Sequence, residues 1–356
     1  MKSILVVDDE EIVLEEIRAH LGFYHAHLAK SGRTALEMAR FLKPDLIILD
    51  IIMPGMNGFE VLDQLQQHPH LRQIPVILLT DDDTPAMQVK GLKSGAVDFL
   101  LKPVDREILH HRIKLHLNFA EYRRSLEHSV SELENNIGLS FAELIECKDY
   151  NFSGHVMRTG KYAEFLALSL YDEELFAGEL SLSFIETLAR AAPFHDIGKI
   201  GISEEILCKR GCLNSEELKT VHTHTVIGAR ILDDIYDRIP SRPYFKMAEL
   251  IARGHHERFN GTGYPEGFAG EDIPLCCRIV SVVNVYDACV SERVYHPPME
   301  HGKACEVIEQ GRGTEFDPAV ADVFLQHNDK FARLGEEMKT LSLQLGTSPA
   351  LREICQ

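Results

Sequence analysis

The sequence lacks any long hydrophobic run. None of its apolar stretches approaches the roughly 18 to 20 residues that cross a bilayer. The opening stretch MKSILVVDDE turns acidic after a few apolar positions, so we expect no signal peptide. These absences exclude a membrane-embedded protein, and we expect no membrane partner.

A disulfide framework is also missing. The eight cysteines form no CxxC pair and show none of the spacing typical of a disulfide-rich secreted domain. We therefore expect a reducing, cytoplasmic location. The cysteines are Cys147, Cys208, Cys212, Cys276, Cys277, Cys289, Cys305 and Cys355.

Positive charge is scarce. The chain has 37 Lys and Arg against 55 Asp and Glu, which gives a formal net charge of −18. Such a charge repels nucleic acids and anionic membranes at long range, so we expect no DNA partner. A small anionic ligand remains compatible with this charge if bound metal concentrates positive charge locally.

The length of the chain predicts more than one domain. At 356 residues it is long for one compact core. We expect one domain over residues 1–105, a helical connector over 106–147 and a second domain over 148–356.

Residues 1–105 alternate apolar runs of strand length with amphipathic stretches of helix length. The runs SILVVDD, PDLIILD and PVILLT are continuous, as expected of strands that are buried on both faces. This alternation predicts a doubly wound α/β domain with a five-stranded parallel sheet.

Acidic residues follow the predicted strands of this domain. Parallel strands bring the residues at their carboxyl ends to one edge of the sheet, where three carboxylates would repel one another. A hard cation such as Mg²⁺ relieves that repulsion. The residues expected at this edge are Asp8, Asp9, Asp50, Thr80 and Lys102.

The stretch DIIMPGMNG, which starts at Asp50, closely resembles the response-regulator receiver family. The resemblance covers the whole segment and implies a flavodoxin-like fold, with Asp50 as the acceptor of a phosphoryl group from a sensor histidine kinase. It further implies Asp8 and Asp9 as Mg²⁺ ligands, Thr80 and Lys102 as the switch pair, and Phe99 as the rotating aromatic. The alternative is that these acids only cap helices.

The connector predicts one long helix. It contains no proline, and apolar residues recur along it at steps of four and three, with one extra step of four. This is a heptad seam with a stutter, which favours a helix paired with a second copy in a dimer. The alternative is an amphipathic helix that packs on its own domain. The seam consists of Leu115, Phe119, Tyr122, Leu126, Val130, Leu133 and Ile137.

Residues 148–356 read mostly as amphipathic helices, and histidines concentrate within them. A single buried histidine is more often a packed core residue than a ligand. Five histidines, one of them followed by a carboxylate, are hard to explain by packing alone. They are His155, His195 with Asp196, His224, His255 and His256.

The pair His255 and His256 predicts a site with more than one metal ion. Neighbouring residues on a helix point about 100° apart, so two adjacent imidazoles reach two ions more easily than one. Asp196 has two carboxylate oxygens and can bridge the ions, whereas His195 binds only one of them.

Three stretches resemble the HD-GYP subgroup of the HD phosphohydrolase superfamily: HDIGKIG from His195, HTVIG from His224 and HHERFNGTGYP from His255. The resemblance implies an all-α HD-type fold and a bi- or trinuclear site, here with two iron or manganese ions. It also implies hydrolysis of cyclic di-GMP to the linear dinucleotide or to GMP.

The same resemblance suggests roles for individual residues. Metal ions would activate water for in-line attack, with Asp196 bridging them and Lys199 stabilising or protonating a phosphate oxygen. The alternative for Lys199 is a surface salt bridge. The residues expected to contact substrate are Gly263 and Tyr264 in the loop, and Arg293 and Tyr295 after the last motif helix.

The chain departs from the family at several positions. Asn284 occupies a ligand position where the family carries aspartate, and an amide oxygen is a weaker ligand than a carboxylate. Asn151 stands where trinuclear members carry glutamate, so a third ion is not expected. Asn260 replaces an aspartate before the loop, and Val294 and His296 alter the phosphate clamp around Arg293.

Two hypotheses follow. In the first, phosphorylation of Asp50 controls an output domain that hydrolyses cyclic di-GMP at a binuclear site. In the second, the substituted output domain binds a cyclic dinucleotide or a protein partner and signals without hydrolysis. The second hypothesis rests on Asn284, Asn151 and His296 together. The predicted metal ligands are His155, His195, Asp196, His224, His255 and His256, with Asn284 as a weaker seventh.

Overall fold

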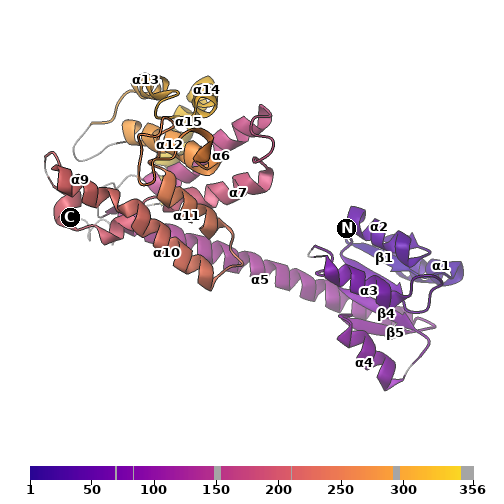
Figure 1. The fold of residues 1–356 in the computed structure, drawn as a ribbon. Coiled ribbons are helices and arrows are strands. Elements are labelled where there is room, and N and C mark those ends of the chain that lie inside the picture. The colour runs from indigo at the N-terminus through magenta and orange to yellow at the C-terminus, as the bar shows by residue number, and fades with distance from the viewer. Residues whose placement is uncertain (69, 83, 148–153, 210, 292–296, 346–356) are drawn as a thin grey trace. The chain divides into compact units, whose positions relative to one another are not determined.

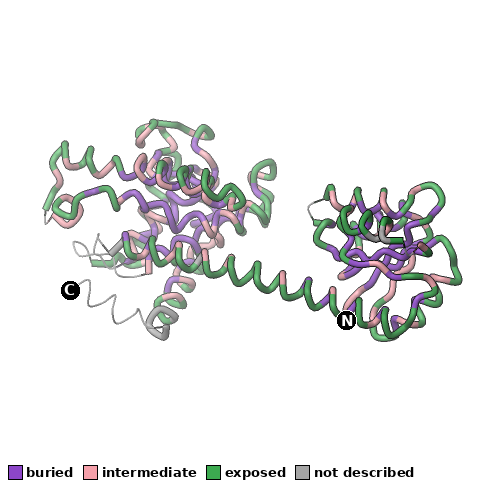
Figure 2. The backbone as a smooth tube through the Cα atoms, turned by 90° about the horizontal axis from the view of Figure 1, so that it is seen from below, coloured by how far each residue is buried: buried purple, intermediate pink, exposed green. Residues whose placement is uncertain are grey.

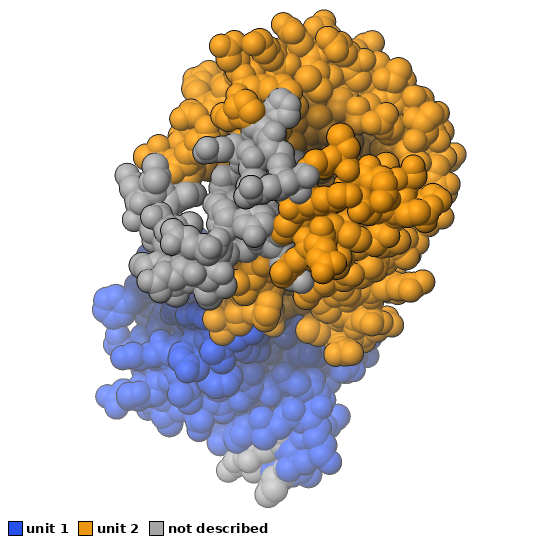
Figure 3. Space-filling model, turned by 90° about the vertical axis from the view of Figure 1, so that its left-hand side faces the viewer, with its two compact units in different colours: residues 1–132 blue, residues 133–356 orange. Residues whose placement is uncertain are grey.

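The structure is a computed structural model of the full chain, and it divides into two compact units (Figure 3), Met1–Glu132 and Leu133–Gln356. It describes all residues except 69, 83, 148–153, 210, 292–296 and 346–356. Each unit is described by itself below.

The first unit is built on a five-stranded parallel sheet with strand order β2-β1-β3-β4-β5. All residues of β3 and β4 are buried, which explains their continuous apolar sequence. Both faces of the sheet carry a hydrophobic cluster. The strands are β1 (Ser3–Val7), β2 (His25–Ala29), β3 (Leu46–Asp50), β4 (Val76–Thr80) and β5 (Asp98–Leu101).

Helices between the strands cover the sheet (Figure 1), and polar side chains cap two of them. The Ser31 side chain accepts a hydrogen bond from Thr34 N at α2, and Asn57 forms a capping box with Glu60 at α3. The doubly wound fold expected from the sequence is confirmed. These helices are α1 (Glu11–His20), α2 (Gly32–Leu42), α3 (Gly58–Gln67) and α4 (Pro85–Lys93).

Helix α5 (Arg106–Cys147) is continuous through the predicted connector. In the first unit its residues Leu109, Ile113 and Leu117 are buried against the sheet. The seam residues Leu115 to Ile137 are exposed, and Figure 2 shows the middle of the helix largely in green. The seam residues of each unit are therefore not packed into the core of that unit.

The second unit is helical, as expected for the HD-type fold. Three short 3₁₀ helices interrupt the α-helices: η1 (Ala192–Phe194), η2 (Ile197–Gly201) and η3 (Gly270–Asp272). The α-helices are α6 (His155–Asp172), α7 (Leu182–Ala191), α8 (Glu204–Leu207), α9 (Ser215–His222), α10 (His224–Arg238), α11 (Tyr244–Gly254), α12 (Leu275–Val290), α13 (His301–Gly311), α14 (Pro318–Gln326) and α15 (Asn328–Leu345).

An aromatic cluster holds α6, α12, α14 and α15 together. Tyr162 and Tyr286 are both 1% exposed, and their ring centroids lie 5.6 Å apart. Phe331 contacts both tyrosines. This packing fixes α6 against α12, the two helices that carry His155 and Asn284.

No helix within the described residues combines the length and hydropathy needed to cross a membrane.

Candidate metal centres

Asp8, Asp9 and Asp50 lie together at the carboxyl edge of the first unit's sheet. Asp8 directly follows β1 and Asp50 ends β3, and these strands are paired in parallel. One carboxylate oxygen from each acid lies within 4.8 Å of the others. Lys102 Nζ lies 2.7 Å from Asp8 Oδ2 and 2.8 Å from Asp50 Oδ1. The structure thus brings together the three predicted acids and the predicted lysine.

The environment of Asp50 favours its protonated form. Burial raises the pKa of Asp50 to about 6, although the ion pair with Lys102 acts in the opposite direction. The nearby charges of Asp8 and Asp9 raise it further. Asp8 and Asp50 are buried and Asp9 is exposed. Crowded carboxylates are the arrangement that a divalent cation stabilises, so these residues fit a Mg²⁺ ion.

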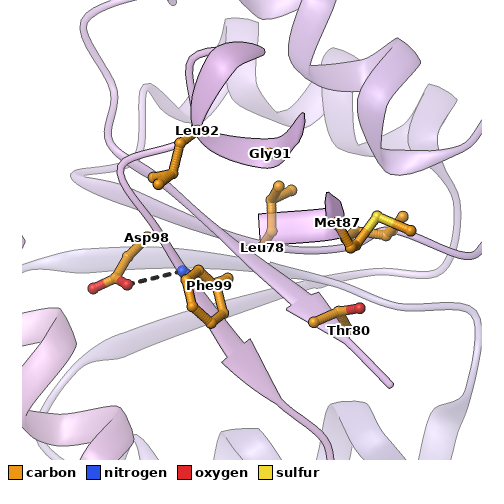
Figure 4. Close-up of a pocket in the computed structure, with 8 residues that line it drawn as sticks. Leu78, Thr80, Met87, Gly91, Leu92, Asp98 and Phe99 are labelled. Carbon is orange, nitrogen blue, oxygen red and sulfur yellow. Dashed lines mark hydrogen bonds between the residues drawn. The ribbon is translucent and has the colours of Figure 1, made fainter. Parts of the chain in front are cut away.

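Thr80 and Phe99 lie beside this edge. The Thr80 hydroxyl accepts a hydrogen bond from Asp82 N at 3.0 Å, which stabilises the loop after β4. Phe99 is partly buried and lines a small hollow together with Thr80 and Met87. Figure 4 shows the three side chains around this hollow, which lies between α4 and the sheet.

Histidines and an aspartate converge in the second unit from four places in the chain. His155 begins α6, His195 and Asp196 lie between η1 and η2, His224 begins α10, and His255 and His256 follow α11. Their ligand atoms form two groups, each spanning no more than 4.8 Å. The four-ligand group is Asp196, His224, His255 and His256, and the three-ligand group is His155, His195 and Asp196.

The HD motif approaches α10 closely because of a glycine. A Cβ on Gly198 would lie 1.9 Å from His224 O and 2.5 Å from Gly228 N. No larger residue fits between these backbones, so Gly198 lets η2 pack directly on α10. That packing brings Asp196 to His224, with Oδ1 and Nε2 3.2 Å apart.

Hydrogen bonds fix the tautomers of four ligand imidazoles. A backbone carbonyl only accepts hydrogen bonds, so a ring nitrogen that faces one must donate. Nδ1 therefore carries the proton in His195, His224 and His255, and donates to Ala192 O, Val221 O and Ile251 O at 3.0, 2.6 and 2.9 Å. Nδ1 of His155 donates to Asp287 Oδ2 at 2.6 Å.

The opposite ring nitrogens of these residues consequently present lone pairs to the centre of the cluster. His155 Nε2 and His195 Nε2 face each other at 3.3 Å. Asp196 Oδ1, His224 Nε2 and His255 Nε2 are buried and have no hydrogen-bond partner among the residues that the structure describes. Facing lone pairs repel unless a cation lies between them, so both groups fit metal ions of the kind that imidazole and carboxylate bind.

The protonation states agree with this geometry. Burial lowers the pKa of His255 to about 4 and holds the pKa of His256 well below its ordinary value. Burial acts to raise the pKa of Asp196, but Lys199 and His195 outweigh it and hold that pKa well below its ordinary value. Neutral imidazoles around an ionised carboxylate are metal ligands in their binding form.

The structure corrects the expectation that His255 and His256 reach different ions. Both contribute to the four-ligand group. The 100° argument fails because α11 ends at Gly254, so that the two histidines lie on the turn after the helix. Their ring centroids are 4.1 Å apart.

Lys199 lies inside the cluster. Its Nζ is 2.9 Å from Asp196 Oδ2, and its side chain is only 14% exposed. The ion pair is therefore part of the candidate site, which disfavours the alternative of a surface salt bridge.

The loop after the paired histidines is held by Glu257, which is buried. Its carboxylate accepts hydrogen bonds from Glu266 N at 2.8 Å and from Gly267 N at 3.1 Å. A Cβ on Gly263 would lie 2.3 Å from Arg258 N, so only glycine fits there. This arrangement stacks the Tyr264 ring on His256, at 4.8 Å between centroids.

Both units match known domain families. Residues 4–114 match the response regulator receiver domain, and residues 140–320 match the HD domain. The chain belongs to the HD-domain response regulators.

Three relatives of this HD-domain response regulator align with it over most of its length. A "probable cyclic di-GMP phosphodiesterase" of Vibrio cholerae is 36% identical over 97% of this chain and 83% of its own length. The "cyclic di-GMP phosphodiesterase response regulator RpfG" of Xanthomonas campestris is 32% identical over 97% of this chain and 92% of its own. A "cyclic di-GMP phosphodiesterase" of Thermotoga maritima is 31% identical over 91% and 90%.

The remaining predicted residues of the response regulator lie on α12, in the loop after the paired histidines, or outside the described residues. Asn284 is partly buried on α12, and Asn260 Oδ1 accepts hydrogen bonds from Thr262 within the loop. Asn151, Arg293, Val294, Tyr295 and His296 lie outside the described residues.

Sequence reasoning did not find the contacts of four residues that organise the cluster. Asp287 holds His155, and Arg158 in turn holds Asp287 through two hydrogen bonds of 2.6 and 2.9 Å. His222 stacks on Tyr264 at 3.7 Å between centroids. Glu257 stands next to the paired histidines, and its place in the HHE run was the one available signal.

Proposed function

We propose that this response regulator hydrolyses cyclic di-GMP at the HD centre, under control of phosphorylation at Asp50. The observation that carries the proposal is the pair of ligand groups that share Asp196, with buried lone pairs directed at common points. The relatives named as cyclic di-GMP phosphodiesterases support cyclic di-GMP as the substrate.

The ions proposed for the two groups are iron or manganese. When bound, a pair of divalent ions activates water and neutralises charge on a phosphodiester. The imidazoles of His155, His195, His224, His255 and His256 hold them as neutral ligands.

The residues around the ions take separate roles. Asp196 shares its two oxygens between the groups. The Lys199 ammonium, already within 2.9 Å of Asp196, stabilises a phosphate oxygen and delivers a proton to the leaving group. Gly263 keeps the loop backbone close, and the ring of Tyr264 offers a stacking surface for a guanine base. Arg293 and Tyr295 complete the proposed substrate contacts.

The receiver supplies the control. A sensor histidine kinase donates a phosphoryl group to Asp50, with Mg²⁺ held by Asp8 and Asp9. Lys102, which already pairs with Asp50, stabilises the added charge. Thr80 and Phe99 then respond as the switch pair and aromatic of the receiver, and Figure 4 shows the hollow beside them.

The described cysteines support the proposed cytoplasmic location. Cys212, Cys276, Cys277 and Cys305 among them are free thiols. Free thiols on this scale are typical of a reducing compartment.

The proposal includes a homodimer formed along α5. Its exposed apolar residues repeat every 11 residues, since Leu115, Phe119 and Tyr122 are followed by Leu126, Val130 and Leu133. Ile137, Phe141 and Leu144 continue the repeat, and all nine side chains are between 42% and 69% exposed. An 11-residue repeat keeps one stripe on a nearly straight helix and is typical of helices that pair.

The area of this stripe suits a second copy of the chain. Nine large side chains that each hide on the order of 100 Å² would bury about 900 Å² on each helix. A stable interface needs roughly 800 Å² per partner.

The test of the proposed activity is hydrolysis of cyclic di-GMP by purified full chain loaded anaerobically with Mn²⁺ or Fe²⁺. We expect linear dinucleotide or GMP from the wild type, and none from Asp196→Ala, which loses the shared ligand. Metal analysis accompanies each assay. Two bound ions with no turnover would contradict the proposal and favour the non-catalytic hypothesis, and turnover restored by Asn284→Asp would then identify the cause.

A further inference from the structure

We infer that the two ligand groups around Asp196 bind metal with unequal affinity. The four-ligand group holds its ion tightly, whereas the three-ligand group holds an exchangeable ion whose affinity is set by Asp287. This inference rests on the proposed two-metal site and adds an order of binding to it.

The ligand count is the first reason. Three imidazoles and Asp196 surround the four-ligand position, whereas two imidazoles and the same carboxylate surround the three-ligand position. A missing protein ligand leaves one coordination position to water. The two ions would also share the negative charge of the Asp196 carboxylate, which belongs to both groups. The three-ligand ion therefore gains less binding free energy from the protein.

Asn284 is the second reason. It lies three residues before Asp287 on α12, so both residues lie on nearly the same face of that helix. Asp287 contacts His155, which places this face at the three-ligand group. A side chain from this position that reaches the ion contributes a neutral amide oxygen, which binds divalent ions less strongly than a carboxylate does.

The third reason is the hydrogen-bond acceptor that holds the His155 ring, which differs in kind from the acceptors of His195, His224 and His255. In His195, His224 and His255, Nδ1 donates a hydrogen bond to a backbone carbonyl no more than four residues away in the chain. His155 instead donates to a side chain 132 residues away, the carboxylate of Asp287. Its orientation therefore depends on how α12 packs against α6.

A buried network fixes that carboxylate. Arg158 Nε donates to Asp287 Oδ1 at 2.6 Å, and its terminal nitrogen donates to Ser291 Oγ at 2.7 Å. All four residues of the network, including His155, are no more than 8% exposed. A carboxylate behind an imidazole makes it a more basic ligand, so Asp287 partly offsets the weakness that Asn284 introduces. Asp287 is thus a positioning residue for one ion of the pair.

The experiment is an equilibrium titration of the chelator-treated full chain with Mn²⁺ alone, with free Mn²⁺ measured by electron paramagnetic resonance. We expect two classes of site, one ion each, with dissociation constants at least about tenfold apart. Asn284→Asp should tighten the weak class and leave the tight class unchanged. His256→Ala, the control for the other group, should weaken only the tight class.

Asp287→Asn tests the positioning role. The change keeps the shape of the side chain but removes its charge, and we expect the weak class to lose affinity about 10 to 100-fold with the tight class unchanged. Circular dichroism checks the fold of this variant. Ser291→Ala, which removes only the outer hydroxyl of the network, provides a milder change in the same direction if Asp287→Asn does not fold.

The outcomes separate this inference from the proposed function. Two ions of equal affinity, or an Asp287→Asn protein in which both classes weaken alike, would overturn the inference while leaving a two-metal site in place. Failure to bind a second Mn²⁺ at millimolar concentration, even in Asn284→Asp, would overturn both. Two unequal classes that respond as described support the inference whether or not the chain turns over substrate.

Discussion

Single residues decide the shape of the HD centre, and Gly263 shows this most directly. A Cβ at this position would lie 2.5 Å from Glu257 Cα and 2.6 Å from His256 O. Gly263→Ala should therefore displace the loop, lower the free energy of unfolding by about 1 to 3 kcal/mol and reduce cyclic di-GMP turnover. Chemical denaturation and the hydrolysis assay measure the two effects.

Gly302→Ala is the matched control. It lies in α13, and a Cβ there would meet no atom within 4 Å. We expect it to stabilise the protein slightly, by about 0.5 kcal/mol, because alanine loses less backbone entropy on folding. Similar losses in both variants would contradict the steric argument at Gly263.

Because of Asp50, we expect the free energy of unfolding of the receiver to depend on pH. Its folded pKa of about 6 lies above the ordinary 3.8, so the folded state binds the proton more tightly than the unfolded chain. The associated stabilisation is fully present below pH 3.8 and is lost as pH rises through about 6. Asp50→Asn removes this loss and should raise the melting temperature at pH 7 on the order of 4 °C without Mg²⁺.

The comparison at low pH provides the check. At pH 4 the Asp50 carboxyl of the folded wild type is protonated, so wild type and Asp50→Asn should melt at nearly the same temperature. An advantage of the variant that is as large at pH 4 as at pH 7 would show that the effect does not come from this titration. Differential scanning calorimetry at both pH values gives the answer.

At the residue scale, the sequence was enough to choose side chains that the structure brings together, but not to pair them with their supports. The motifs contain His195, His224, His255 and His256 directly. The contact between His155 and Asp287 joins residues 132 positions apart, and no local pattern encodes it. It depends on the packing of α6 against α12.

At the scale of secondary structure, α5 carries the prediction for the dimer. Deleting residues 126–136 removes one 11-residue repeat and keeps the remaining stripe in phase. Deleting residues 126–134 turns the two halves of the stripe to opposite faces, because nine residues rotate a helix by about 180° beyond whole turns. We expect the first protein to dimerise and the second to be monomeric in analytical ultracentrifugation.

The two deletions are closely matched, since both remove Leu126, Val130, Leu133 and the ion pair of Glu134 with Arg242. A difference in oligomeric state between the two proteins therefore reflects the phase of the stripe and not the residues removed. If both proteins are monomers, or both are dimers, the stripe is not the interface.

Elements with a clear period were predictable, and those broken by tertiary contacts were not. Strands β1, β3 and β4 of the receiver have continuous apolar runs and were placed correctly. The stretch from Ser181 to Ile200 reads as one amphipathic helix, but the structure breaks it into α7, η1 and η2. The close approach of Gly198 to α10 fixes the chain there, and this contact is invisible to periodicity.

At the scale of the whole molecule, the sequence predicted a doubly wound domain followed by a helical HD-type domain, and both are confirmed. The domain limits at 105 and 147 remain predictions. Helix α5 begins at Arg106 and ends at Cys147, but the two compact units divide within it, after Glu132, so no turn marks where one unit ends and the next begins.

The most direct test of the account is the rate of cyclic di-GMP hydrolysis measured against the number of Mn²⁺ ions bound per chain. The account predicts no turnover while one ion is bound and a rate that rises with the second ion. Full turnover with a single ion, or undiminished turnover in Asp196→Ala, would contradict it.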